Sequence, residues 1–169
     1  MKRIVFGVCI VVLVFSFAAQ GQAPGLPAGP EHKKLEVWAG NWTVQGEAKN
    51  NPSGPAYKVN WTMQGEWLPG GFFLLINGSA KYTDREVRWL EVLGYDPVKK
   101  THIGYVFWLQ WGGRATYTMT FKDRSILTGG QGWRQEWKFS PDGMSLTGKR
   151  EREQDGKWWT AFDVKGVKK

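Results

Sequence analysis

The chain has 169 residues, a formal net charge of +8 at pH 7 and a single cysteine, Cys9. One cysteine excludes a disulfide framework and a cysteine-rich metal site. The basic residues are scattered among acidic ones and their largest cluster is the C-terminal tail, so we interpret the charge as a solvated face and expect no nucleic-acid partner.

The N-terminus predicts export. Lys2 and Arg3 precede an uncharged apolar run over residues 4–17, and small residues follow at 18, 19 and 21. This is the layout of a secretory signal peptide over residues 1–21, and the run is too short for a comfortable membrane span. We expect a periplasmic or secreted protein with no stable membrane span after processing, and a retained N-terminal anchor is the alternative. Residues 22–30 (QAPGLPAGP) predict a flexible Pro/Gly-rich linker.

Residues 31–169 have the usual size of one domain. Only residues 31–37 predict a short helix, just before the first strand. From Asn41 onward apolar residues recur at every second position, which is the pattern of half-buried strands. The clearest alternating runs cover residues 41–48, 57–64, 87–93, 114–121 and 133–139.

Turn-forming sequences separate these runs, at residues 50–55, 69–71, 96–97, 112–113, 141–143 and 155–156. Short strands at this regular spacing indicate an all-β sandwich or barrel rather than a fold with alternating helices. The sequence therefore predicts about ten antiparallel strands.

Two runs, residues 72–76 (FFLLI) and 103–109, are apolar on both faces. Each must be covered on its outer side by a helix, a loop or a partner, since an open apolar patch favours association. A homodimer is therefore a predicted assembly.

Eleven tryptophans and an aromatic fraction of 15% suggest more large rings than a small core needs. Aromatic residues at strand spacing commonly fill a core, yet a barrel of eight to ten strands can also enclose one small ligand. As walls of such a cavity we expect aromatic residues from the alternating runs, with three polar residues as anchors. The ligand-binding candidates are Trp42, Trp61, Trp89, Trp137, Glu91, Arg114 and Tyr117. Phe107 also lies in such a run.

Residues 35–47 (LEVWAGNWTVQGE) carry a family resemblance. A short helix followed by Gly-x-Trp at residues 40–42 resembles the start of lipocalins and other calycin-type barrels. The longer pattern, with Gly46-Glu47 and the later Leu-Gly-Tyr-Asp at residues 93–96 before Lys99 and Lys100, resembles the bacterial family called domain of unknown function 1579. The resemblance spans residues 31–164. It implies a calycin-like (lipocalin-like) antiparallel barrel, often exported, with no established activity.

One position departs from the lipocalin pattern, in which an arginine near the last strand packs over the Gly-x-Trp tryptophan. The predicted last strand, residues 158–164, has no arginine. Arg150, Arg152 or Lys165 are the expected substitutes.

Catalytic and metal-binding patterns are sparse. His32 and His102 are far apart in the chain and no His-x-His spacing exists, so we expect no metal site and no cofactor; haem would need His102 or a tyrosine as its ligand. No serine has a Gly-x-Ser-x-Gly setting. Glu47, Glu66 and Glu91 lie within apolar-rich strands, where burial would raise a carboxyl pKa and suit acid–base chemistry, unless an arginine pairs with them.

The sequence thus predicts an exported, noncatalytic barrel that binds a small, partly apolar molecule. Two alternatives stay open. One is an enzyme that uses a buried glutamate in the same cavity, and the other is a structural or interaction protein whose barrel is filled by its own side chains.

Overall fold

The computed structural model describes residues 28–82 and 85–169. They contain two short helices, α1 (Pro30–Lys33) and the 3-10 helix η1 (Lys34–Trp38), followed by strands. The strands are β1 (Gly40–Ala48), β2 (Tyr57–Trp67), β3 (Phe73–Lys81), β4 (Glu86–Asp96), β5 (Thr101–Trp108), β6 (Gly113–Lys122), β7 (Ser125–Gly130), β8 (Trp133–Phe139), β9 (Ser145–Gln154) and β10 (Lys157–Lys168). The predicted signal peptide, residues 1–21, and most of the predicted linker lie outside the described residues.

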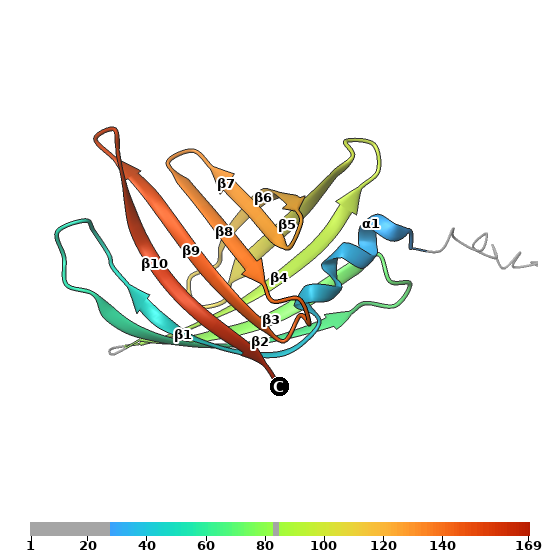
Figure 1. The fold of residues 1–169 in the computed structure, drawn as a ribbon, viewed down its shortest axis with the longest axis horizontal. Helices are drawn as coiled ribbons and strands as arrows, with labels where there is room; N and C mark the ends of the chain where they lie inside the picture. The colour runs from blue at the N-terminus through green and yellow to red at the C-terminus, as the bar shows by residue number, and fades with distance from the viewer. Residues whose placement is uncertain (1–27, 83–84) are drawn as a thin grey trace, which may run out of the picture.

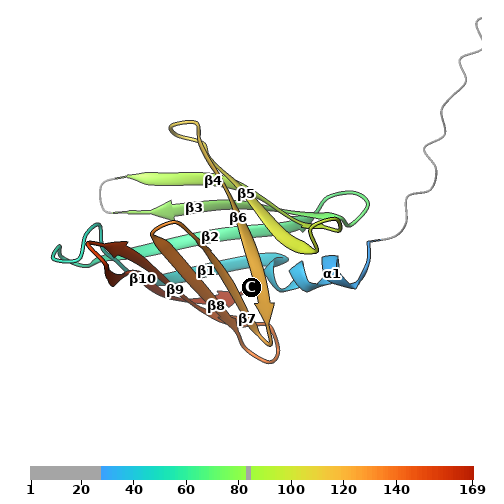
Figure 2. The same ribbon diagram turned by 90° about the horizontal axis from the view of Figure 1, so that it is seen from above.

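The ten strands form one closed antiparallel barrel in which each strand pairs with its neighbours in sequence and β1 closes the ring against β10 (Figures 1 and 2). The predicted all-β, calycin-like barrel of about ten strands is therefore confirmed. The turn residues act as expected. At the β9–β10 hairpin, Asp155 and Gly156 both have positive φ (53° and 72°), which is the backbone that a two-residue turn between twisted strands requires.

The predicted N-terminal helix is also confirmed, as α1 and η1 together, and it packs against the end of the barrel where β1 begins and β2 ends. We call this end the capped end and the opposite one the far end. Leu35 and Trp38 of η1 are buried, and the Trp38 ring lies edge-on to Trp137 and Phe139, with centroid distances of 5.2 and 5.0 Å. The helices therefore fill the barrel's capped end with large side chains.

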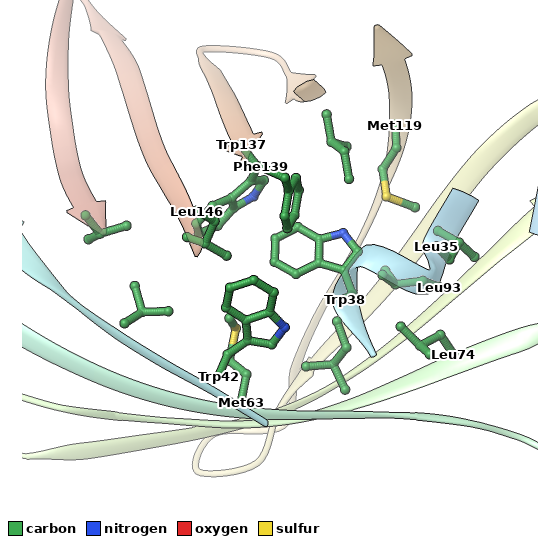
Figure 3. Close-up of a cluster of buried hydrophobic side chains, with 14 of the residues drawn as sticks. Leu35, Trp38, Trp42, Met63, Leu74, Leu93, Met119, Trp137, Phe139 and Leu146 are labelled. Carbon is green, nitrogen blue, oxygen red and sulfur yellow. The ribbon is translucent and has the colours of Figure 1, made fainter. Parts of the chain in front are cut away.

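Inward-facing positions divide into two halves along the barrel. At the capped end the inward residues, Trp42, Leu74, Leu93, Met119 and Leu146 among them, are buried and form the hydrophobic core with η1 (Figure 3). Toward the far end Phe162 is still buried, but most inward aromatic residues are only half-buried. The half-buried ones are Tyr57, Trp61, Trp89, Trp108, Tyr117 and Trp133. Solvent therefore reaches the inner face in the far half, whereas the capped half is packed.

The two runs that are apolar on both faces, residues 72–76 and 103–109, place side chains on the outer face of β3 and β5. Its side chains Phe73, Tyr105 and Phe107 are 46%, 42% and 42% exposed. Register places Leu75, Val92 and Tyr105 in one row across β3, β4 and β5. The described part of the chain leaves this patch open to solvent, so the homodimer stays a prediction.

Candidate ligand-binding site

Glu91 faces the barrel interior from β4, between Trp89 and Leu93 on the same face, as the alternation predicts. The Tyr117 hydroxyl of β6 donates a hydrogen bond to Glu91 Oε1, although β5 lies between the two strands. Gly104 of β5 makes this possible, because a Cβ there would sit 2.3 Å from Tyr117 Cζ. The absence of a side chain at Gly104 lets the tyrosine ring lie across β5.

Trp89 uses the same arrangement on the other side of Glu91. Its indole ring lies over Gly78 of β3, where a Cβ would come within 2.1 Å of Trp89 Cε2. The Trp89 side chain is a second hydrogen-bond donor to Glu91. Two aromatic donors from β4 and β6 therefore hold one inward carboxyl group.

Burial raises the pKa of Glu91 above its usual value of 4.5, and the hydrogen bonds from Tyr117 and Trp89 and the charge of Arg150 oppose part of that rise. Burial also raises the pKa of Tyr117 well above 10, and the neighbouring Glu91 raises it further. At neutral pH Tyr117 is therefore a hydrogen-bond donor.

Arg150 brings a positive charge into the same interior from β9. Its Nε donates to Gln135 Oε1 of β8 at 2.7 Å, and its guanidinium carbon lies 5.0 Å from the Trp133 ring centroid and 5.2 Å from that of Phe162. Burial, followed by the charge of Arg152, lowers the pKa of Arg150 to about 10. Arg150 is therefore a cation at neutral pH.

One chain of contacts joins these groups. The Tyr117 ring lies 6.3 Å from Trp133, which contacts Arg150, and Phe162 on the other side of Arg150 lies 5.0 Å from the Trp61 ring. We name Glu91, Tyr117, Gln135 and Arg150 the interior polar cluster. It lies on the inner face among the half-buried aromatic residues, on the far-end side of the packed core.

Most of the predicted site residues border this cluster. Trp89 lies beside Glu91, and the Trp61 ring lies 5.0 Å from Phe162. Trp137 contacts Trp61 and Phe162, at 6.4 and 6.0 Å between ring centroids, but it is buried in the core and lies edge-on to Trp38. Trp42 does not border the cluster. It is 2% exposed in the capped half, beside Phe139, so it belongs to the core.

Arg114 was expected as a polar anchor, and this placement is wrong. Arg114 of β6 is exposed, and the strand register sets it opposite Phe107 of β5. Both side chains point outward, because Tyr117 and Gly104, which lie three residues away on the same strands, face the interior. Arg150 supplies the interior positive charge instead. Glu47 and Glu66 are also exposed, so the expectation that they are buried is wrong. Of the three glutamates, only Glu91 faces the barrel interior.

The expected substitutes for the lipocalin arginine are wrong as well. None of the three, Arg150, Arg152 or Lys165, lies over Trp42. Lys168 does, with its Nζ 5.2 Å from the indole centroid, because β10 continues to Lys168, beyond the predicted strand end at residue 164.

Sequence reasoning did not anticipate that the two histidines contact the same tyrosine ring. His32 and His102 both contact the Tyr95 ring, at 5.7 and 4.9 Å, and His102 Nε2 lies 2.8 Å from the Glu31 carbonyl oxygen. These contacts fasten α1 to the capped end. Among residues 28–82 and 85–169, no group of three or more His, Cys, Asp or Glu side chains is placed to hold a metal ion.

Two hollows lie apart from the interior polar cluster. One, of about 290 Å³, includes Glu47, Lys49 and Trp159 beside the β1–β2 loop, and the other, of about 350 Å³, includes Val37 and Phe121 at the capped end. Phe162 borders both the first hollow and Arg150. We assign the candidate site to the interior because charged and hydrogen-bonding groups converge there. No helix in the described part of the chain is long and apolar enough to cross a membrane.

The sequence model of the family described as "Protein of unknown function (DUF1579)" matches residues 27–121, more than half of the chain. The chain belongs to this family. Its predicted membership is thereby confirmed. The matched DUF1579 stretch covers β1 to β6 and contains Glu91, Gly104 and Tyr117, whereas Gln135 and Arg150 follow it.

The DUF1579 protein is also similar to the crystal structure of Rv2717c from M. tuberculosis. The two share 11% sequence identity with a TM-score of 0.50, over 84% of this chain and 99% of Rv2717c. At that identity the likeness shows the barrel fold alone. No curated protein matches the chain.

Proposed function

We propose that this DUF1579 protein is an exported, noncatalytic barrel that binds a small, partly apolar molecule in the far half of its interior, in the periplasm or outside a bacterial cell. The observation that carries the proposal is the interior polar cluster among half-buried aromatic side chains. Burying a carboxyl group and a guanidinium costs free energy that an apolar core would not incur. Their retention beside solvent-accessible rings supports a binding role.

The combination matches the general character of small-molecule sites, which are mostly apolar with a few convergent polar groups. The core around Trp38 and Trp42 packs the capped half, and a smaller part of it, including Ala48 and Phe162, extends into the far half. The proposed domain plan keeps a signal peptide at residues 1–21, a linker at 22–30 and the barrel from residue 31 onward.

Tryptophan fluorescence tests the proposal, because several indoles border the cluster. Titration with a panel of apolar and aromatic compounds should change the emission of the wild type, and Glu91→Gln should alter the affinity of at least one binder. Arg114→Gln on the outer face is the matched control and should behave as the wild type. If no compound changes the emission, and native mass spectrometry of protein from its own host finds no retained molecule, the barrel is a filled structural one.

The raised pKa of Glu91 favours a second candidate, an enzyme that uses this carboxyl group as an acid or base. Native mass spectrometry separates the two functions. A binding protein retains the same molecule in the wild type and in Glu91→Gln. An enzyme retains a substrate in Glu91→Gln that differs in mass from what the wild type holds.

A further inference from the structure

Arg150 has hydrogen-bonding capacity that the described residues do not use. A guanidinium carries five N–H donors in one plane. The Nε donor goes to Gln135, while Trp133 and Phe162 form cation–π contacts with the guanidinium. Within the described residues no carboxylate forms an ion pair with Arg150, so its Nη donors are left for another acceptor.

Glu91 is not the acceptor for the Nη donors of Arg150, because other side chains form the hydrogen bonds to its carboxyl group. Tyr117 and Trp89 donate hydrogen bonds to its carboxyl group, and Arg150 acts on it only through the field of its charge. Gln135, the direct partner of Arg150, is neutral. The interior therefore holds a cation whose contacting neighbours are all uncharged.

We propose that the ligand is a small, partly apolar monocarboxylate, held by the guanidinium of Arg150 and packed against the half-buried rings of Trp61 and Trp133. This deepens the proposed function and rests on it. The planar fork of an arginine matches the two oxygens of a carboxylate. Trp133 contacts the Arg150 guanidinium directly, and Trp61 reaches it through Phe162, so an apolar body attached to the carboxylate lies beside these two rings.

The charge balance favours one negative charge over two. A monocarboxylate neutralises Arg150, whereas a phosphate monoester would bring a second charge near Glu91, and an unpaired buried charge is costly. Glu91 then links binding to protons. A ligand anion near the Glu91 carboxyl group favours the neutral, protonated form of that group. The charge of Arg150 and the hydrogen bonds from Tyr117 and Trp89 favour the ionised form and oppose this effect. Arg152 and Tyr82 are the other titratable groups whose charge acts on Arg150.

Matched pairs of acids and amides test the inference by titration calorimetry at constant pH. Naphthalene carboxylate is compared with naphthalene carboxamide, and decanoate with decanamide, so that shape is kept and only the charge changes. The wild type should bind the acid of at least one pair roughly ten- to a hundredfold more tightly than its amide, as a charge-assisted hydrogen bond implies. Arg150→Gln should bring the acid down to the affinity of the amide, and Arg114→Gln should keep the preference.

Two further measurements guard against misfolding of Arg150→Gln. Arg150→Lys keeps the charge without the fork and should retain only part of the preference. For the wild type, calorimetry in two buffers of different ionisation enthalpy should show proton uptake on binding the acid, and Glu91→Gln should show less.

The outcomes separate the two claims. Equal affinity for acid and amide in the wild type leaves the proposed function standing and overturns the carboxylate. An acid preference that survives in a folded Arg150→Gln places the anchor elsewhere and also overturns it. Failure of every acid and every amide to bind overturns this inference and leaves the proposed function to the fluorescence titration and native mass spectrometry.

Discussion

Gly104→Ala tests the geometry on which the candidate site depends. The Cβ that it adds would lie 2.3 Å from Tyr117 Cζ, 2.6 Å from the hydroxyl oxygen and 2.7 Å from Cε1. Ordinary contacts between such atoms begin near 3.5 Å, so the ring must retreat by about 1 Å. The ring packs against Trp133, and its hydroxyl bonds Glu91, so that movement breaks the hydrogen bond across β5.

The expected loss of stability follows from two effects. Overpacking costs about 1–3 kcal/mol, and a lost hydrogen bond to a charged group about 1.5–3 kcal/mol. Alanine gains back about 0.5–1 kcal/mol over glycine in a strand. We expect Gly104→Ala to lower the free energy of unfolding by about 2–5 kcal/mol, measured by urea denaturation with linear extrapolation.

A double-mutant cycle gives the sharper result. In a Tyr117→Ala background the ring is gone, so adding Gly104→Ala should be nearly neutral. Gly29→Ala is the control, because its Cβ meets nothing within 4 Å and its φ of −82° suits alanine. The same cost for Gly104→Ala in both backgrounds, or no more than that of the control, would refute a tyrosine lying over β5.

Four other predictions follow from the fold and the site. The pKa of Glu91 in the folded chain lies above its unfolded value of 4.5, so the folded chain stays protonated at this carboxyl group to higher pH than the unfolded chain does. The unfolding free energy of the wild type should therefore fall relative to that of Glu91→Gln as pH rises above 4.5, and a difference that stays flat or rises contradicts this. Trp42→Ala should cost about 3–5 kcal/mol in denaturant unfolding, and a barely shifted midpoint would place Trp42 outside the core. Intact mass of the exported protein should show a mature chain that starts between Ala19 and Gln22, and a membrane-bound mass that retains Cys9 would rule cleavage out. Sedimentation should show a dimer in the wild type that Phe107→Asp dissociates, whereas a monomeric wild type would leave the outer patch without a partner copy.

Most of the barrel could be predicted because its strands alternate. Along β4, the positions of Trp89, Glu91 and Leu93 already indicate one shared face, and the structure keeps them there. Gln135 shares its face with Trp133 and Trp137 in the same way. The turn residues then divide the chain into hairpins, so that strand number and antiparallel pairing follow from local pattern alone.

The error at Arg114 has a plain physical cause. Alternation along β6 already separates Arg114 from Tyr117, so both could not face one interior. Arg150 gave no such signal. Toward its end β9 carries polar residues on both faces, Arg150 and Arg152 on one and Lys149 and Glu151 on the other, so no hydrophobic alternation sets the orientation of this part of the strand. Its direction comes from pairing with Gln135 of β8 and Phe162 of β10, which only the folded register specifies.

The polar residues of the interior thus come from strands that are distant in sequence, and each interrupts an otherwise apolar face or a weakly patterned strand. Local rules and global fold agree almost everywhere in this chain, and places where they disagree commonly mark function. The cost of burying Glu91 and Arg150 without direct pairing falls in the far half, at the edge of the packed core. A barrel filled only for stability would place apolar side chains at both positions, since such replacements of buried charge are often neutral or stabilising. The positions of these two charges therefore carry more information about function than the many tryptophans do.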